Sequence, residues 1–250
     1  MTELAIIGGT GLTCLQHLNI DRREVIRTPY GEPSDTLAIG DLYGKDVIFL
    51  ARHGAGHTIP PHKVNYRANL WALHAQGVKR VIAVCAVGGI HADIIPGAVV
   101  IPDQIIDYTW SRNHTLFESD LSRVTHIDFT DPYCPEMRQL ILDAASRTGI
   151  DVLRSGTYGA SQGPRLETAA EINRMERDGC DMVGMTGMPE AALARELDLS
   201  YASIGVSANA AAGRGEGAID MGMIEKNLET GMEKVRKIVE QVITAGWQGA

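Results

Sequence analysis

Residues 52–57 carry the densest group of side chains that could do chemistry. They read RHGAGH and follow directly after an apolar, strand-like stretch at 47–51. Arginine is the side chain whose shape best fits two oxygens of one phosphate group. Backbone N–H groups in a glycine-rich bend can complete an anion-binding cradle. The stretch therefore indicates an anion site around Arg52, although an ordinary surface arginine next to a capping histidine would also explain Arg52 and His53 taken alone.

The elements that must position these side chains follow an alternating order. Short apolar runs alternate with longer helical patterns, which predicts a largely parallel sheet with helices on both faces. We expect strands at 4–7, 47–51, 81–85, 98–101, 155–158, 181–184 and 201–206. We expect helices at 66–76, 135–148, 168–178, 189–197 and 225–244. The fold class is thus α/β, with a twisted, mixed but largely parallel sheet flanked by helices.

No linker or repeat divides the chain, so we expect one domain over residues 1–250. Two stretches, 108–135 and 209–222, read as irregular and either carry function or are disordered. Open α/β sheets bind ligands at the carboxyl ends of their strands. Four strands are followed by, or end in, residues that could bind a ligand, and we expect these residues at one edge of the sheet. They are Thr10, Arg52 with His53, Ala86, and Thr186.

Composition excludes several classes of protein. The net charge of −8 argues against nucleic acid or an anionic membrane surface as a partner. The four cysteines are scattered without a C-x-x-C pair, which disfavours a zinc site and fits the reducing cytoplasm. No apolar run reaches the ~18 residues that span a bilayer, and the chain opens directly into a strand-like run that leaves no room for a signal peptide.

Common catalytic motifs are absent from the sequence. Residues 8–11 read GGTG after a strand, but Cys14 stands where a dinucleotide-binding loop has its third glycine, and a purely structural turn fits equally well. The sequence has neither a G-x-S-x-G elbow nor an H-E-x-x-H helix. Serine hydrolases and zinc proteases are therefore disfavoured.

Four ordered motifs together resemble the trimeric purine nucleoside phosphorylases and methylthioadenosine phosphorylases. They are GGTGL at 8–12, RHGAGH at 52–57 with its spacing to GGI at 88–90, GPRLET at 163–168, and MTGMPE at 185–190. The resemblance runs from about residue 4 to about residue 245. It implies phosphorolysis of a purine N-glycosidic bond in a homotrimer, or a dimer of trimers. Inorganic phosphate would be the co-substrate, with no metal and no organic cofactor.

The resemblance also implies a role for individual residues. Phosphate would be held by Thr10, Arg52, His53, the Ala86 backbone N–H and Thr186. Met185 would lie under the ribose, with His57 near the 5′ end of the sugar. His126, together with Phe129, would reach the site of a neighbouring subunit, although a plain loop explains His126 equally well.

The purine side departs from adenine-specific relatives. They carry two aspartates where this chain has Asn209 and Ala211, and they tend to have serine where this chain has Glu167. The Asn209 amide can donate to O6 and accept from N7–H, and by resemblance Glu167 accepts N1–H, which adenine lacks. Leu166 replaces a usual phenylalanine, so stacking on the base should be weaker. The resemblance implies a 6-oxopurine site formed by Asn209, Glu167, Leu166 and Ala211.

The 5′ side departs from ordinary 6-oxopurine enzymes, which bind the 5′-hydroxyl with a late histidine. This chain has no histidine after His126 and offers Met221 and Ile224 instead. These apolar side chains suit a methylthio group, so 5′-methylthioinosine is the expected substrate. Inosine, guanosine and methylthioadenosine are the alternative substrates, and a catalytically inactive nucleotide-binding protein is the alternative of another class.

Overall fold

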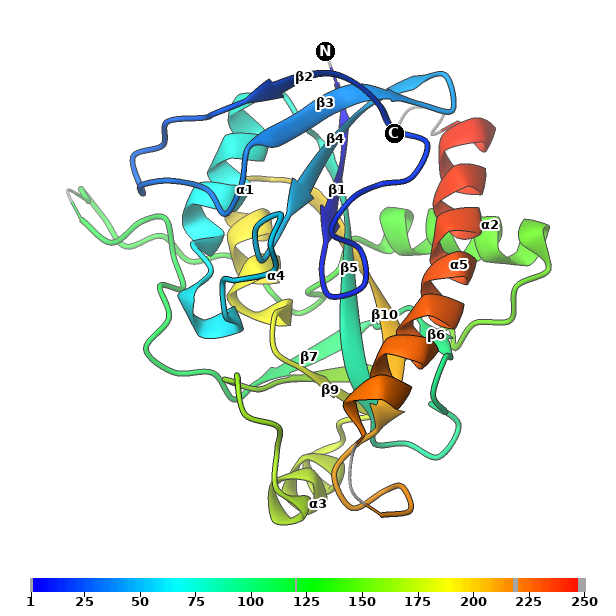
Figure 1. Cartoon of the computed structure of the whole chain (residues 1–250). Helices are drawn as coiled ribbons and strands as arrows, with labels where there is room; N and C mark the ends of the chain where they lie inside the picture. Colours follow the sequence, from blue (N-terminus) through cyan, green and yellow to red (C-terminus); the bar gives the residue numbers. More distant parts are fainter. Residues whose placement is uncertain (1, 120, 218–219, 247–250) are drawn as a thin grey trace.

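One ten-stranded sheet crosses the molecule and holds every strand of the described residues in the computed structural model, 2–119, 121–217 and 220–246 (Figure 1). The strands are β1 (Leu4–Gly8), β2 (Asn19–Glu24), β3 (Leu37–Leu42), β4 (Lys45–Ala51), β5 (Arg80–Gly89), β6 (Val99–Val100), β7 (Gln104–Asp107), β8 (Thr157–Ala160), β9 (Met182–Gly184) and β10 (Ser200–Ala210). The helices are α1 (Tyr66–Ala75), α2 (Pro135–Thr148), α3 (Ala169–Asp178), α4 (Gly187–Glu196) and α5 (Met221–Ala245), with a 3-10 turn at Pro61–Lys63.

The sheet is mixed, as expected, with a parallel centre. Its order is β2-β3-β4-β1-β5-β9-β8-β7, and β10 pairs with β5 and β6. Strand β1 is parallel to both β4 and β5, β5 is parallel to β10, and β8 is parallel to β7 and β9. The antiparallel pairs are β2 with β3, β3 with β4, β5 with β9, and β6 with β10. The α/β fold class predicted from the sequence is confirmed.

Alternation along the central strands divides the interior into two cores. In β1, Ala5 and Ile7 belong to the core that α1 and α4 cover, whereas Leu4 and Ile6 belong to the core that α2 and α5 cover. This division follows from the two-residue period of a strand, since both faces of a central parallel strand are buried. Figure 1 shows α1 and α4 on one side of the sheet and α2 and α5 on the other. A third, smaller core lies beneath α3.

The predicted helices match the structure closely, whereas three strands were not predicted. Helix α2 spans 135–148 as predicted, and α5 begins at Met221, four residues before the predicted start, because the Asp220 side chain accepts hydrogen bonds from the N–H groups of Gly222 and Met223. Strands β2, β3 and β7 were not predicted; β2 lies almost entirely in solvent, so it has no alternating pattern to detect. The strand expected at 155–158 lies at 157–160.

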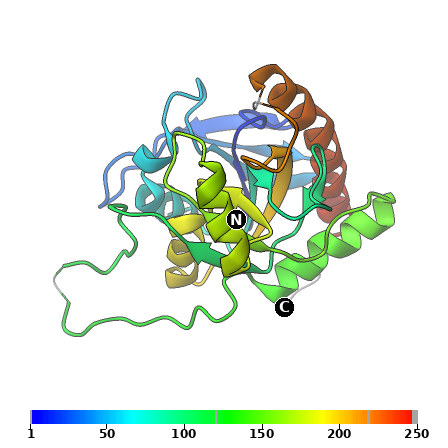
Figure 2. The same ribbon diagram turned by 90° about the horizontal axis from the view of Figure 1, so that it is seen from below.

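The segment between β7 and α2 forms a long irregular loop, as the sequence indicated. It projects away from the body of the molecule and is drawn in green in Figure 2. All four cysteines are free thiols. Across the stretches that the structure describes, no helix is both long and apolar enough to cross a membrane.

Candidate functional site

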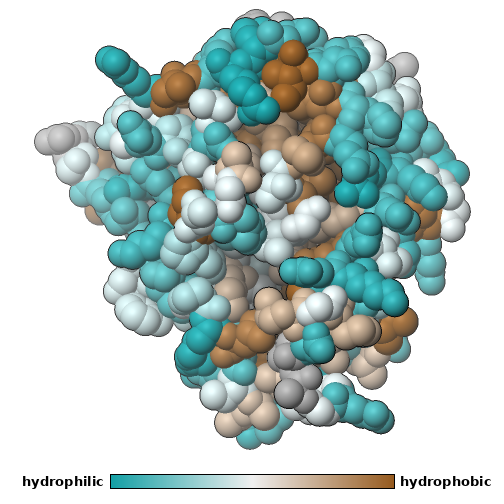
Figure 3. Space-filling model, viewed as in Figure 1, coloured by the Kyte–Doolittle hydropathy of each residue, from teal (hydrophilic) through white to brown (hydrophobic). Residues whose placement is uncertain are grey.

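A cavity of about 430 Å³ opens at the carboxyl edge of the sheet, next to the first turns of α5. On the face drawn in Figure 3, apolar side chains line a furrow between hydrophilic surfaces. The cavity brings together every predicted site residue except His126: Thr10, Arg52, His53, His57, Ala86, Leu166, Glu167, Met185, Thr186, Asn209, Ala211, Met221 and Ile224. The sequence did not single out Pro61, Cys85, Val87, Pro164, Val183 and Leu228, which also line it.

Strand β5 supplies the floor of the cavity through a gap in its pairing. Along one edge of β5, β1 pairs only as far as Ala83, and β9 joins only at Gly88, so residues 84–87 have no strand partner there within the described chain. The carbonyl of Val84 on this edge accepts a hydrogen bond from Arg52. Because backbone groups alternate between the two edges of a strand, the N–H of Ala86 points the same way. This geometry leaves the Ala86 amide available to an anion, and the resemblance predicts that this anion is phosphate.

Gly9 allows the loop after β1 to close over this floor. A Cβ atom at Gly9 would lie 2.7 Å from the carbonyl oxygen of Val84 and 2.8 Å from Nη1 of Arg52. Both contacts are closer than real Cβ atoms show, so only glycine fits there. The close approach places Thr10 beside Arg52 at the polar end of the cavity.

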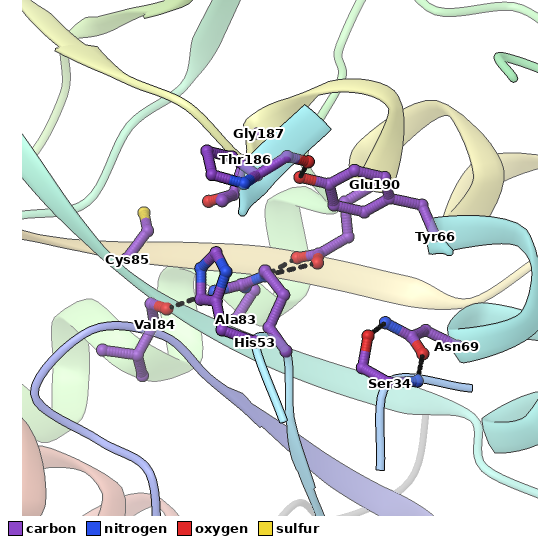
Figure 4. A network of polar contacts seen from close by, with 12 residues as sticks. Ser34, His53, Tyr66, Asn69, Ala83, Val84, Cys85, Thr186, Gly187 and Glu190 are labelled. Carbon is purple, nitrogen blue, oxygen red and sulfur yellow. Dashed lines mark hydrogen bonds and ion pairs between the residues drawn. The ribbon is translucent and has the colours of Figure 1, made fainter. Parts of the chain in front are cut away.

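Arg52 forms a buried ion pair with Glu190, a contact that the sequence does not predict. Its Nε and Nη2 donate to the two carboxylate oxygens of Glu190 at 2.6 and 2.8 Å, and its Nη1 donates to the Val84 carbonyl at 2.9 Å. Figure 4 labels the two acceptor residues, Glu190 and Val84. Three of the five guanidinium N–H groups are therefore used. This corrects the expected geometry: the edge of the guanidinium formed by Nε and Nη2 contacts Glu190, so an anion in the cavity could receive only the remaining N–H groups.

The Arg52–Glu190 pair is buried, so each charge is compensated mainly by the other and very little by water. The side chains are 1% and 0% exposed. Burial is the largest single influence and lowers the pKa of Arg52, but the charge of Glu190 and its hydrogen bonds with Arg52, together with smaller contributions, outweigh burial, so the net direction is upward. Tyr201 donates its hydroxyl to Glu190 at 2.8 Å, and burial raises the pKa of that hydroxyl. The cavity therefore has a permanently charged guanidinium fixed behind its polar end.

His53 is held as a neutral imidazole whose Nε2 is a hydrogen-bond acceptor. Its Nδ1 lies 2.8 Å from the carbonyl oxygen of Ile59, which can only accept, so Nδ1 carries the proton. Burial, followed by the nearby charge of Arg52, lowers the pKa of His53 to about 4. Nε2 then carries a lone pair, so it can accept a hydrogen bond from a protonated phosphate oxygen.

The buried neutral state of His53 predicts a loss of stability in mild acid. The pKa of an unfolded histidine is about 6.5, whereas the pKa of native His53 is about 4. Between these two pH values the unfolded chain binds a proton that the native protein does not bind. The free energy of unfolding should therefore fall as the pH is lowered from about 6.5 to about 4. In His53→Gln this fall should be shallower, as measured by urea unfolding across that range. An identical pH dependence in wild type and variant would contradict the assignment.

Two hydroxyl-bearing side chains face the same polar end. Thr10 Oγ1 lies 3.4 Å from Nε2 of His57, an exposed residue held with a positive φ of 51°. The N–H groups of Thr186 and Gly187 donate to the buried Tyr158 hydroxyl at 3.2 and 3.3 Å. Tyr158 thus fixes the bend after β9, which presents Thr186 to the cavity.

Asn209 and Glu167, which were expected to bind the base, lie at the carboxyl end of β10 and in the loop after β8. Asn209 donates one amide N–H to the carbonyl of Ala210 at 2.6 Å, which leaves its other N–H and its oxygen for a ligand. The hydroxyl of Ser161 donates to Glu167 at 2.5 Å, so one carboxylate oxygen is fixed and the other is available. Leu166 is 43% exposed and lies at the rim.

An apolar stripe of α5 closes the remaining side. Met221, Ile224 and Leu228 line the cavity at intervals of three and four residues, which places them on one helical face. Met221 is 65% exposed at the rim, whereas Leu228 is only 3% exposed. The helical spacing could have identified Leu228 from the sequence.

His126 lies exposed in the loop between β7 and α2 and does not line the cavity of its own chain. Phe129, which was expected to reach a neighbour together with His126, packs against the core that α1 and α4 cover. The proposed contribution of His126 to a neighbouring subunit stays a prediction.

Known proteins match this chain over most of its length. The sequence pattern of the Phosphorylase superfamily matches residues 3–244. A protein of Pseudomonas syringae pv. tomato named "Probable S-methyl-5'-thioinosine phosphorylase" is 52% identical over 245 residues, covering 98% of this chain and 100% of that protein. The 6-oxopurine nucleoside phosphorylase of Pyrococcus furiosus is 49% identical over 218 residues, covering 85% of this chain and 81% of that protein. The methylthioadenosine phosphorylase of Schistosoma mansoni, solved in complex with adenine, superposes with a TM-score of 0.94 at 32% identity, covering 98% and 92% of the two chains.

Proposed function

Because the chain belongs to the Phosphorylase superfamily, we propose that it catalyses phosphorolysis of S-methyl-5′-thioinosine. The products are hypoxanthine and 5-methylthioribose 1-phosphate. One observation supports the substrate above others: a single cavity combines Asn209 and Glu167 with the apolar stripe Met221, Ile224 and Leu228. The first pair suits a 6-oxopurine, and the stripe suits a thioether in place of a hydroxyl.

The reaction needs phosphate in line behind the anomeric carbon. A phosphate oxygen forms a bond to that carbon while the bond to N9 of the purine breaks, so positive charge develops on the sugar and negative charge flows to the base. Thr10, His53, Thr186 and the Ala86 amide would hold phosphate, with Arg52 behind them. Such positioning and preorganised charge supply much of the acceleration in reactions of this type. The leaving base carries the electron pair of the broken bond and takes a proton at N7 from solvent at the open rim of the cavity, and the Asn209 oxygen accepts a hydrogen bond from the resulting N7–H.

The co-substrate in this proposal is inorganic phosphate, and no organic cofactor or metal takes part. Among the relatives, the one from Pseudomonas syringae pv. tomato bears the name of the same activity, and the one from Pyrococcus furiosus is named for 6-oxopurine nucleosides. Both names agree with a 6-oxopurine substrate. The deciding experiment is the set of kcat/KM values for methylthioinosine, methylthioadenosine and inosine with phosphate present. Inosine as the best substrate would instead support an ordinary purine nucleoside phosphorylase.

Base selectivity should favour hypoxanthine over adenine. Against a 6-amino purine, the Asn209 N–H and the Glu167 carboxylate would be left without partners, and each unpaired buried group costs ~1–3 kcal/mol. We therefore expect methylthioinosine to exceed methylthioadenosine in kcat/KM by roughly one to two decades. Asn209→Asp should reduce that preference in the same assay. Equal or faster turnover of methylthioadenosine by the wild-type enzyme would overturn this assignment.

The active assembly is proposed to be a homotrimer, or a dimer of trimers. The loop between β7 and α2 projects from the body and exposes Trp110, Leu121 and Val124, with His126 a short distance along the chain (Figure 2). Such a loop suits a contact with a second copy of the chain. Light scattering should give a mass that is three times that of the chain or a multiple of it. A fully active monomer would refute the proposed assembly.

A further inference from the structure

Arg112 is half-buried in the loop after β7 and has no part in the chemistry described above. Its guanidinium nevertheless makes more hydrogen bonds than that of Arg52. In the described part of the chain none of these goes to a carboxylate; they go to backbone carbonyls, one amide side chain and one tyrosine hydroxyl. A charged side chain whose hydrogen bonds go mainly to backbone oxygens serves to fix the shape of those backbones.

The backbones that Arg112 joins come from two separate loops. Its Nη1 donates to the carbonyl of Met185 at 2.9 Å, in the bend after β9, and to the carbonyl of Met188 at 2.6 Å, a residue with non-helical φ and ψ in the first turn of α4. Its Nη2 donates to the carbonyls of Ser161 at 3.2 Å and Gln162 at 2.8 Å, in the loop after β8. Nε donates to the Gln162 side chain at 3.2 Å. One guanidinium therefore bridges the two loops.

Each bridged loop ends in the cavity. The first contains Met185, which lines the proposed ribose position, and Thr186. The second contains Ser161, whose hydroxyl holds the Glu167 carboxylate at 2.5 Å. Gly163 brings the loops into contact, because a Cβ atom there would lie 2.5 Å from Sδ of Met185. Displacing either loop would shift the base-recognising carboxylate relative to the sugar.

Neighbouring groups keep Arg112 itself in place. Its guanidinium carbon lies 5.7 Å from the ring centroid of Tyr66, on the first turn of α1. The side chain of Gln162 also accepts the N–H of Trp110 at 3.2 Å, which anchors the loop two residues before Arg112. The guanidinium is thus held between α1 and the two loops.

We infer that Arg112 is a positioning residue. It fixes the Glu167 carboxylate relative to the bend at Met185, so that both can contact one nucleoside. This inference rests on the proposed function, since it assigns base recognition to Glu167. Arginine is needed because its rigid plane presents donors in several fixed directions, whereas the lysine ammonium has three donors on a flexible stem.

The test compares Arg112→Met, which keeps the aliphatic stem, with Arg112→Lys and with Arg174→Met. Arg174 is the control: its guanidinium carbon lies 5.3 Å from the ring centroid of Tyr108, but among the described residues its one ion pair is with Asp178, and it does not line the cavity. In Arg112→Met we expect kcat/KM for methylthioinosine to fall by roughly 10- to 100-fold, because small misplacements of reacting groups are costly. The preference over methylthioadenosine should fall in parallel, Arg112→Lys should be intermediate in both, and Arg174→Met should match the wild type.

A second readout separates this inference from the proposed function. Amide hydrogen exchange should speed up at residues 161–167 and 185–188 in Arg112→Met, and in the same segments to a smaller extent in Arg112→Lys, but not in Arg174→Met. Unchanged exchange together with unchanged base preference would overturn the role of Arg112 while leaving the reaction intact. A wild-type enzyme that cleaves no purine nucleoside would overturn the proposed function, and hydrogen exchange would then decide whether Arg112 fixes the two loops.

Discussion

Replacing Glu190 by alanine is expected to lower the free energy of unfolding by roughly 3–5 kcal/mol, the range for breaking a buried ion pair by removing one partner. The Arg52 and Glu190 side chains are 1% and 0% exposed, so the remaining guanidinium would stay charged with no counter-ion and little water. Tyr201 would also lose its acceptor. Urea unfolding measures the change directly, and Glu190→Gln, which keeps one oxygen acceptor, should lose less.

A double variant separates the structural role of this pair from its role in the reaction. Arg52→Met with Glu190→Leu replaces both charges by apolar groups, and such replacements often restore the stability of a buried pair. We expect the double variant to unfold at a higher urea concentration than Glu190→Ala. Its phosphorolysis should nevertheless stay ~10²–10³-fold below wild type, because the cation behind the phosphate is gone.

The outcomes of this experiment are distinct. A double variant that is stable and near wild type in kcat and in KM for phosphate would show that Arg52 serves the fold alone. A double variant that is stable and inactive would support the proposed phosphate role. A Glu190→Ala variant as stable as the wild type would contradict the ion-pair argument itself.

The sequence predicts which residues of the candidate site come together when those residues directly follow a strand. Thr10, Arg52 and Thr186 each follow an apolar run, and parallel strands bring their carboxyl ends to one edge, so their meeting in the cavity follows from the fold class. The bounds of helix α2 can also be predicted from the sequence, because the helix begins at Pro135 and ends before Gly149, which has a positive φ of 69°.

What the sequence did not reveal are contacts between distant positions that share no local pattern. Glu190 follows Arg52 by 138 residues, and its carboxylate lies on a helix whose period gives no reason to place a charge in the core. Arg112 stands in a polar loop that looks solvated. Its function is visible only when the carbonyls of two other loops are seen to converge on it. Strand β2 was missed because its side chains lie in solvent and carry no alternation.

Methylthioinosine is expected to exceed inosine in kcat/KM by on the order of 10²-fold or more. The stripe formed by Met221, Ile224 and Leu228 should surround the 5′ substituent. Moving a methylthio group from water onto such a surface gains roughly 1–2 kcal/mol, at ~0.8 kcal/mol per buried CH₂. A 5′-hydroxyl in the same place without a partner loses a further ~1–3 kcal/mol, and 1.36 kcal/mol corresponds to about one decade.

Helix α5 offers a matched pair of variants for this prediction. Met221→His introduces a hydrogen-bond partner at the rim of the stripe and should narrow the gap between the two nucleosides. Met223→His places the same side chain two residues further along, at a methionine that is 53% exposed and does not line the cavity. That variant should keep the wild-type ratio, because residues two apart on a helix point in different directions. Equal kcat/KM for inosine and methylthioinosine in the wild-type enzyme would show that the stripe does not select the 5′ group. If Met221→His and Met223→His change the ratio of the two kcat/KM values equally, the charge of the introduced histidine, and not its contact with the 5′ group, causes the change.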